Sequence, residues 1–345
     1  MQWQCPLPKF DFDVITLGHG GGGLLTHKLL QGGVFDVLQN DFLNQQHDGA
    51  VLELQGPLAF STDSFVVSPI FFKGGNIGEL AINGTVNDLA MCGALPKYLS
   101  LSFILEEGLK TTELATLLQS IRIAADRAGV KIVTGDTKVV EQGKGDKIFI
   151  NTSGIGVMHK TAKIHHNRIV AGDAVIVSGS LANHGIAIMS EREGLEFETD
   201  IVSDTRPLNH LVQALLDQFG EGIKFLRDPT RGGVASVLNE VAEITGLGVE
   251  IAQSQLPVAP QVEGACEMLG LDPLYVANEG IFIVVAERSI AENVVQLLQD
   301  SEYGKEATII GFVNNQTPGK VLLKSNIGGR RVVNYLTGEQ LPRIC

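Results

Sequence analysis

The sequence predicts an α+β protein with two domains, flanked by a glycine-rich N-terminal segment and a polar C-terminal one. Its 345 residues exceed the usual size of one hydrophobic core, and 44% apolar against 19% charged residues is typical of globular proteins. Strand-like and helix-like segments alternate irregularly in both halves. A polar stretch beginning at His159 separates the halves. We therefore predict a flexible arm at 1–30, domains at 31–162 and 163–325, and a mobile tail at 326–345.

The first half contains short runs of β-branched and aromatic residues between two amphipathic helices. Asn76 and Glu79 have the spacing of a capping box at the start of the first helix, and Gly129 ends the second, which has the clearer apolar periodicity. The predicted strands are 65–72, 96–105, 130–136 and 147–158, and the predicted helices are 76–94 and 111–129.

The second half repeats this mixture with a new buried strand at its start. Pro207 occupies a favourable position at the beginning of a helix with one apolar face. The predicted strands are 174–177, 281–287, 307–313 and 320–324, and the predicted helices are 207–219, 232–246 and 260–270.

Composition excludes several classes of function. The net charge is −13 with no basic block, which argues against a nucleic-acid surface. The N-terminus has no signal-peptide pattern, and the strongest apolar run, 281–286, is too short for a membrane span. Four cysteines lie far apart with no C-x-x-C pair, so we expect no disulfide framework or zinc site, and a reducing cytoplasm. Cys92 and Cys266 fall in helices among apolar residues, where we expect inert core thiols.

A glycine run at 17–25 has the G-x-G-x-x-G spacing of a dinucleotide-binding turn. The second strand with a terminal acidic residue, which that turn requires, does not follow. We therefore interpret Gly20, Gly21 and Gly22 as part of a flexible phosphate-contacting loop or lid, and a disordered arm is the alternative.

Four aspartates recur where a strand ends or a helix begins: Asp63, Asp88, Asp136 and Asp228. Grouped carboxylates suit hard cations, Mg²⁺ above all, which in turn hold phosphates. Any one of them alone is more commonly a turn or N-cap residue. Four of them beside glycines favour a metal–nucleotide site.

Three further residues are candidates for chemistry. Lys138 lies two positions after Asp136, on the same strand face, and is either a phosphate ligand, a base or a surface lysine. Glu279 precedes a glycine and a buried strand, where a carboxylate is either a cap or catalytic. Cys345 ends the sequence without a prenylation signal or a resolving cysteine nearby. The residues after Gly328 span roughly 55 Å when extended, so a mobile tail can carry this thiol into a site, although chance placement is the alternative.

These motifs together resemble a known superfamily. "STDSFVVSP", "NGTVNDLAMCGA", "VTGDTKVV", "RDPTRGG" and "VANEG" follow a glycine-rich arm in that order. The order is similar to that of the aminoimidazole ribonucleotide synthetase-like ATP-binding superfamily, which includes selenophosphate synthetase and thiamine-monophosphate kinase. The ending "PRIC" resembles that of its carbamoyl dehydratases, which act in nickel–iron hydrogenase maturation.

The resemblance implies a fold, a reaction and partners. It implies two α+β domains, a homodimer whose first-domain sheets form a central barrel, and ATP with Mg²⁺ at the interface. A carbamoyltransferase (HypF) would load a carbamoyl group onto Cys345. ATP would drive its dehydration to a thiocyanate, and an iron scaffold (HypC–HypD) would receive the cyano group as a cyanide ligand.

The resemblance also assigns roles to residues. Asp63, Asp88, Asp136 and Asp228 map onto metal–phosphate positions, and Lys138 and Glu279 onto residues that move protons around the thiol. Gly20, Gly21, Gly22 and Asn87 complete the nucleotide site.

Other functions of the superfamily make different demands on the sequence. A selenophosphate synthetase would use a cysteine and lysine in the arm, which Cys5 and Lys9 only partly match. A small-molecule kinase would not need Cys345, and a non-enzymatic scaffold would not need the aspartates.

Overall fold

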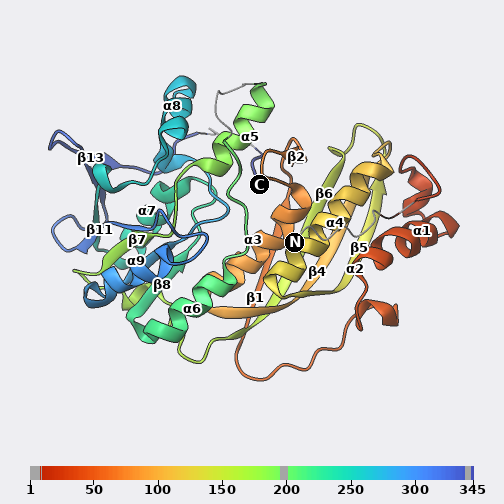
Figure 1. Cartoon of the computed structure of the whole chain (residues 1–345), viewed down its shortest axis with the longest axis horizontal. Helices are drawn as coiled ribbons and strands as arrows, with labels where there is room; N and C mark the ends of the chain where they lie inside the picture. Colours follow the sequence, from red (N-terminus) through yellow and green to blue (C-terminus); the bar gives the residue numbers. More distant parts are fainter. Residues whose placement is uncertain (1–7, 9, 195–200, 339–342) are drawn as a thin grey trace.

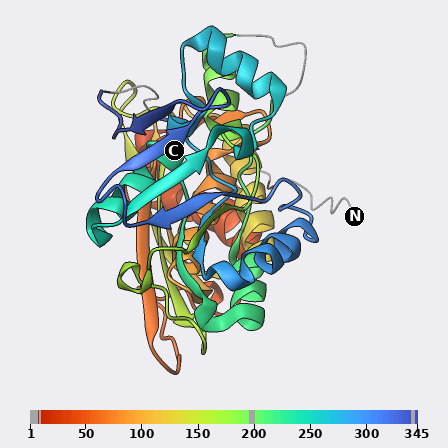
Figure 2. The same ribbon diagram turned by 90° about the vertical axis from the view of Figure 1, so that its left-hand side faces the viewer.

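A computed structural model of the chain describes residue 8 and residues 10–194, 201–338 and 343–345. Two α+β domains lie side by side, each built on its own sheet (Figure 1). Seen from the side of the second domain, its green-to-blue sheet lies in front of the orange and yellow first domain (Figure 2). Within the described residues, no helix is long and apolar enough to cross a membrane.

The first domain is built on a four-stranded sheet in the order β1-β6-β4-β5. Only β4 and β5 run parallel. Burial alternates along β4, where Leu101 and Phe103 face the helices and Ile104 lies on the exposed face. The strands are β1 (Leu58–Phe65), β4 (Ala94–Glu106), β5 (Lys131–Val140) and β6 (Ile148–Met158).

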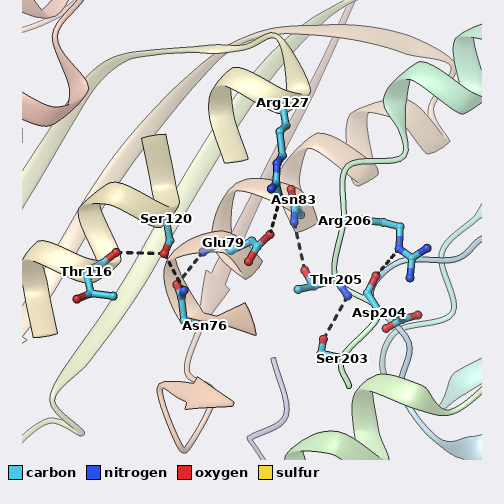
Figure 3. Close-up of polar contacts among 10 residues, drawn as sticks. All are labelled: Asn76, Glu79, Asn83, Thr116, Ser120, Arg127, Ser203, Asp204, Thr205 and Arg206. Atoms are coloured by element: carbon cyan, nitrogen blue, oxygen red, sulfur yellow. Dashed lines mark hydrogen bonds and ion pairs between the residues drawn. The ribbon is translucent and has the colours of Figure 1, made fainter. Parts of the chain in front are cut away.

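Two helices, α3 (Ile77–Met91) and α4 (Thr111–Ala128), cover one face of this sheet. The Asn76 side chain accepts hydrogen bonds from the N–H groups of residues 78 and 79 at 2.9 and 3.1 Å, which confirms the predicted cap. Glu79 pairs with Arg127 of α4 at 3.5 Å (Figure 3). Gly129 ends α4 with φ of +70°, a conformation that favours glycine.

The predicted strand at 65–72 is split in two. β1 ends at Phe65, and a short hairpin of β2 (Phe71–Phe72) and β3 (Gly75–Asn76) follows. Residues 66–70 lie outside any strand, and their main-chain groups are free to pair elsewhere.

The second domain is built on a seven-stranded sheet with helices on both faces. Its order is β13-β12-β9-β11-β7-β10-β8. The strands are β7 (Ala174–Val177), β8 (Ile223–Arg227), β9 (Gly248–Ala252), β10 (Ile283–Ala286), β11 (Thr308–Asn314), β12 (Val321–Lys324) and β13 (Arg330–Val333). The helices are α5 (Asn183–Glu193), α6 (Asn209–Phe219), α7 (Gly233–Thr245), α8 (Pro260–Leu269) and α9 (Ala291–Gln299).

The short central strand β7 contributes to two separate cores. Val175 and Val177 pack in the core formed with α5, α7 and α8, whereas Ala174 and Ile176 pack in the core formed with α6 and α9. All four residues are fully buried, which explains why this strand is an unbroken apolar run in the sequence.

The described residues near both ends of the chain pack on the two domains. Residues from Phe10 onward pack on the first domain, and Ile15 and Leu29 are fully buried in its core. The arm folds into a 3₁₀ turn (Leu17–Gly20), α1 (Leu24–Leu29), a π turn (Leu30–Phe35), α2 (Asp36–Leu38) and a 3₁₀ turn (Leu43–Gln45). The predicted flexible arm at 1–30 is therefore wrong from Phe10 on, because its apolar residues have core partners; residues 1–7 and 9 lie outside the described residues.

The predicted mobile tail is wrong over β13, because that strand pairs with β12 and extends the second sheet. Gly328 and Gly329 lie in the hairpin turn between these two strands. The chain after Val333 has a reach of roughly 40 Å if fully extended.

The segment 203–208 ties the two domains together. Asn83 of α3 donates to the Thr205 hydroxyl at 3.3 Å, and the Thr205 N–H donates to the Ser203 hydroxyl at 3.2 Å (Figure 3). Arg206 donates to the Asp204 carbonyl at 2.7 Å, which fixes the turn between them (Figure 3). Residues from both domains can therefore hold fixed positions in one site at this junction.

Candidate functional site

Three of the four predicted aspartates gather at the junction of the domains. Asp63 lies on β1, Asp88 on α3, and Asp228 directly after β8. The Ser61 hydroxyl donates to Asp88 at 2.7 Å. Burial raises the pKa of both Asp63 and Asp88, and the Asp63 charge raises the pKa of Asp88 further. The three carboxylates are therefore close enough to oppose one another's ionisation.

Asp228 is the most perturbed of the three. Only 9% of this residue is exposed, and burial, together with Asp88, raises its pKa to about 7. Among the described residues, no three His, Cys, Asp or Glu side chains converge closely enough to hold a metal ion unaided. Buried carboxylates of like charge nevertheless favour an added cation, so the residues fit a divalent metal whose remaining ligands come from phosphate.

Glu279 is buried beside this cluster. It is 3% exposed, and burial, followed by the charges of Asp228 and Asp204, raises its pKa well above the usual range. Its Oε1 has no hydrogen-bond partner within the described part of the chain. Its N–H donates to an Asp204 carboxylate oxygen at 3.1 Å, which fixes the main chain at this position. A buried acid with a free oxygen is placed to exchange a proton with a ligand.

The residue after Glu279 has to be glycine. A Cβ on Gly280 would lie 1.6 Å from the Asp204 carbonyl oxygen, far inside van der Waals contact. The close approach of these two segments places Glu279 and Asp204 in the same site.

The Cys345 thiol reaches this site. Its Sγ lies 3.4 Å from Nε of Arg231, which donates to it. Burial raises the pKa of the thiol to about 11, with a further contribution from Glu279, and Arg231 opposes the shift. The docked thiol is therefore protonated at neutral pH and a weak nucleophile.

Sequence reasoning missed Arg231. The hydrogen bond with Cys345, together with the charges of Asp63 and Glu279, raises the pKa of this guanidinium, so it balances the acidic site. It precedes Gly232 and Gly233, which have φ of +73° and +60°. A Cβ on Gly233 would lie 2.5 Å from a carbonyl oxygen of residue 274, so the start of α7 can pack here only with glycine. The sequence feature that could have indicated Arg231 is its position between Asp228 and the glycine pair at 232–233.

The predicted nucleotide ligand Asn87 is already fully bonded to the protein. Its side-chain N–H₂ group donates to the carbonyls of Arg206 and Glu279 at 3.0 and 3.2 Å, and its oxygen accepts from the Leu208 N–H at 2.8 Å. Asn87 thus holds Glu279 in place across the domain junction rather than facing a ligand.

Asp136 and Lys138 lie elsewhere, at a second location on β5. As the spacing predicted, they share a face, and their side chains pair at 2.7 Å in an exposed position. Lys138 lowers the pKa of Asp136 by this hydrogen bond. Beside them a cavity of about 280 Å³ has Leu101 and Phe103 among its apolar lining residues.

The glycine run forms part of the same cavity. Gly20 and Gly22 line it, and a Cβ on Gly20 would lie 2.9 Å from the Val139 main-chain nitrogen. Gly20 therefore allows the arm to approach the β5 backbone, whereas contact of the glycine run with a phosphate stays a prediction.

One chain does not bring these two locations together. Asp63 pairs in register with Thr152, whose side chain bonds α3, so Asp63 lies on the helix-covered face. Asp136 lies on β5 and lines the cavity there together with Leu101. Three strand spacings, roughly 14 Å, separate β1 from β5. Within a single chain, neither Asp136 nor Lys138 is part of the thiol site.

Comparison with known proteins identifies the class of protein. Residues 46–158 match the N-terminal domain, and residues 170–324 the C-terminal domain, of the AIR synthase related proteins. The chain therefore belongs to the AIR synthase related proteins, with two α+β domains as the motifs predicted.

Closer relatives narrow this class. The carbamoyl dehydratase HypE of Rhizobium leguminosarum bv. viciae is 46% identical over 332 residues, covering 96% of this chain and 95% of the relative. A crystal structure of the hydrogenase maturation protein HypE in complex with ATP superposes with a TM-score of 0.92 at 45% identity, covering 95% of this chain and 99% of the other. HypE in a HypE–HypF complex superposes with a TM-score of 0.79 at 46% identity, covering 91% and 100%. The chain is thus a member of the HypE family of carbamoyl dehydratases.

Proposed function

We propose that this chain uses ATP to dehydrate a carbamoyl group carried on the Cys345 sulfur, giving a thiocyanate. The observation that carries the proposal is the position of the Cys345 thiol, which lies against Arg231 in a partly buried acidic site. The relative named carbamoyl dehydratase and the ATP complex of a related HypE support the reaction and its energy source.

The proposed reaction balances in atoms and charge. The carbamoyl oxygen attacks the γ-phosphoryl group of ATP, which releases ADP and makes that oxygen part of a phosphate. The C–O bond then breaks as inorganic phosphate departs, and the nitrogen loses both protons to form S–C≡N. The net change is loss of one water from the adduct, coupled to hydrolysis of ATP to ADP and phosphate.

Glu279 is the better candidate for the proton acceptor. Burial and like charges raise the pKa of Glu279, so its carboxylate is more basic than usual, which suits removal of an N–H proton. Its unpartnered oxygen is available to a ligand, and Arg231 can hold the sulfur beside it. Lys138, the other predicted acceptor, is paired with Asp136 away from the thiol.

We assign Mg²⁺ to the carboxylates at the domain junction and the nucleotide to the cavity on β5. Asp63, Asp88 and Asp228 would hold Mg²⁺, which, when bound, supplies charge neutralisation for the phosphates. Asp136, Lys138 and the arm glycines Gly20, Gly21 and Gly22 would hold the nucleotide at the 280 Å³ cavity.

A homodimer would unite the two locations. Leu58 is 50% and Phe60 67% exposed on β1, and Ile104 is exposed on the helix-free face. Apolar side chains of this kind on an open sheet favour a partner sheet, as in the predicted barrel. A two-fold pairing of these faces would place the β5 cavity of one protomer near the carboxylates of its partner.

The proposal includes delivery steps before and after dehydration. HypF would load the carbamoyl group, in line with the complex that a related HypE forms with HypF. A HypC–HypD scaffold would accept the cyano group for its iron. We assign the reaction to the cytoplasm, because the carrier thiol has to remain reduced.

Mass spectrometry of the C-terminal peptide tests the proposal. We expect incubation with HypF, its carbamoyl donor, ATP and Mg²⁺ to give a carbamoyl adduct on Cys345 that loses one water only with ATP. Cys345→Ala should abolish the adduct, whereas Cys92→Ala, a matched change at an exposed thiol, should not. An adduct on Cys5, or ATP hydrolysis indifferent to Cys345→Ala, would overturn the proposal and favour another activity of the superfamily.

A further inference from the structure

The last three residues dock on the protein through their main chain. The Val66 N–H donates to the Cys345 oxygen, and the Ser68 N–H donates to the Arg343 carbonyl, both at 3.2 Å. These donors belong to the segment after β1 that forms no strand with the rest of the protein. Alternate residues on both sides therefore pair as in a short added strand.

His184 of α5 binds the residue between these two pairs. It is fully buried, and its Nε2 lies 2.8 Å from the Ile344 carbonyl oxygen. A carbonyl can only accept, so Nε2 carries the proton, and Nδ1 accepts from the Ser203 hydroxyl at 2.8 Å. Ser203 belongs to the segment that ties the domains together, so the orientation of the ring depends on the assembled junction.

Arg192, at the other end of α5, binds the tail and its docking segment together. Its Nη2 donates to the Arg343 carbonyl at 2.9 Å and to the Ser68 carbonyl at 2.7 Å. Its Nε donates to the same Ser68 carbonyl at 3.1 Å. One guanidinium thus joins two main-chain segments that are far apart in the sequence, which a lysine cannot do with the same geometry.

The side chains of the tail add contacts remote from the sulfur. Ile344 is 3% exposed and packs in the first-domain core. The Arg343 guanidinium donates to the Val66 carbonyl at 3.1 Å and pairs with Asp146. Of all these docking contacts, only the one from Arg231 reaches the sulfur. The strength of docking is therefore largely independent of the group that the sulfur carries.

We propose that His184 and Arg192 form a main-chain clamp, a pair of positioning residues that sets the fraction of time Cys345 spends in the carboxylate site. The clamp holds the thiol and its adducts alike, and its release exposes them to partners. The clamp itself rests on the contacts above. Only its consequence for dehydration rests on the proposed function.

Alkylation of Cys345 in the full chain measures the clamp directly. Docking protects the thiol by burial and by keeping it protonated, so iodoacetamide reacts with the undocked tail. The C-terminal peptide, weighed over time, reports Cys345 separately from Cys92. We expect His184→Ala to speed labelling about 10-fold and Arg192→Ala roughly 10- to 100-fold, since buried and charged hydrogen bonds are lost.

Conservative variants distinguish positioning from general destabilisation. His184→Gln keeps a donor near the Nε2 position and should stay within about 3-fold of the parent rate, and Arg192→Lys should fall between Arg and Ala. His159→Ala is the matched control, because His159 is also a buried histidine but bonds Thr161 and Asp217. It should lower the unfolding temperature without changing Cys345 labelling. Equal labelling in parent, His184→Ala and Arg192→Ala, or an equal increase in His159→Ala, would overturn the clamp.

A second measurement separates this inference from the proposed function. In single-turnover reactions, His184→Ala should keep carbamoyl loading and slow ATP-dependent dehydration only in proportion to the fall in the docked fraction, which is smaller than the gain in labelling while the tail remains mainly docked. Faster labelling in the variants, with no dehydration even in the parent chain, would sustain the clamp and refute the proposed function. Unchanged labelling in the variants, with normal dehydration in the parent chain, would refute the clamp and support the proposed function.

Discussion

The site at the domain junction and the cavity on β5 both contain predicted aspartates, yet the pKa values of these carboxylates shift in opposite directions. At the junction, Asp228 and Glu279 are buried with raised pKa values. On β5, Asp136 is exposed, paired with Lys138, and has a lowered pKa. The junction site is destabilised by repulsion between its own carboxylates, whereas the charge of Asp136 on β5 is already balanced by Lys138.

This difference indicates that ligand binding affects the stability of the fold at the junction but not on β5. A cation or a proton relieves strain at the junction, so ligand binding there is coupled to the stability of the fold. The β5 cavity has no such stress, and its apolar lining suits a base and sugar rather than an unshielded phosphate. We therefore expect substitutions at the junction to affect chemistry and stability together, and substitutions on β5 to affect nucleotide affinity alone.

The largest expected effect is that of Asp228→Asn. Removing this carboxylate should slow dehydration at least about 100-fold, because charge stabilisation around the transferred phosphate is lost. Carbamoyl loading, which occurs outside the site, should persist. Peptide mass spectrometry checks both steps. Asp126→Asn, at an exposed pair on α4, is the control and should leave both unchanged. Normal dehydration in Asp228→Asn would remove this residue from the metal assignment.

The next effect is a pH-dependent loss of stability without divalent cations. The pKa of Asp228 is about 7 in the folded chain, whereas an aspartate in the unfolded chain has the ordinary value of 3.8. The folded state therefore holds the proton more tightly. Stability should then fall as pH rises from about 4 to 7, by up to about 4 kcal/mol at 1.36 kcal/mol per pKa unit. Thermal unfolding at pH 5 and pH 8 measures this. Mg²⁺ should recover part of the loss at pH 8, and Asp228→Asn should reduce it. A melting temperature that does not change with pH would contradict the buried charge.

Much of the fold was predictable because local signals agreed with tertiary packing. The helix at 111–129 has one apolar face and ends at a glycine. Among the strands, β4 alternates between buried and more exposed residues, and β7 is wholly apolar. The split strand at 65–72 was not predictable, since the apolar run continues through residues whose main chain receives the tail instead. Cys92 was predicted to be buried but is exposed, because it ends α3 on the outer side of the helix; Cys266 is buried as predicted.

The site was predictable in residue type but not in grouping. Positions beside turns made candidates of Asp63, Asp88 and Asp228, whereas local sequence does not show that the strand of Asp136 lies at the opposite edge of the sheet from β1. His184 and Arg192 gave no signal, because they bind main-chain atoms of a segment more than a hundred residues away. A sequence motif can indicate residues whose side chains suit metal or phosphate binding. It does not indicate residues, such as His184 and Arg192, whose side chains bind the main chain of a distant segment.

A moderate effect is expected on β5. Asp136→Asn should raise the KM for ATP about 10-fold, the loss of one charged hydrogen bond, while saturating ATP restores the dehydration rate. The unfolding free energy should change by less than about 1 kcal/mol, because the ion pair with Lys138 is exposed. Initial rates across an ATP series test the first part and thermal unfolding the second. A lower kcat with unchanged KM would instead place Asp136 at the phosphates.

The smallest effect concerns strain in the docked tail. Arg343 has φ of +55°, a left-handed conformation that costs a non-glycine residue roughly 1 kcal/mol. Arg343→Ala and Arg343→Asn both lose the contacts with Asp146 and Val66, but asparagine tolerates this conformation better. Labelling of Cys345 should therefore be about 2- to 5-fold faster in the alanine variant than in the asparagine variant. Equal rates would mean that backbone strain at Arg343 does not help to release the thiol from the junction, and that the clamp contacts alone set its residence there.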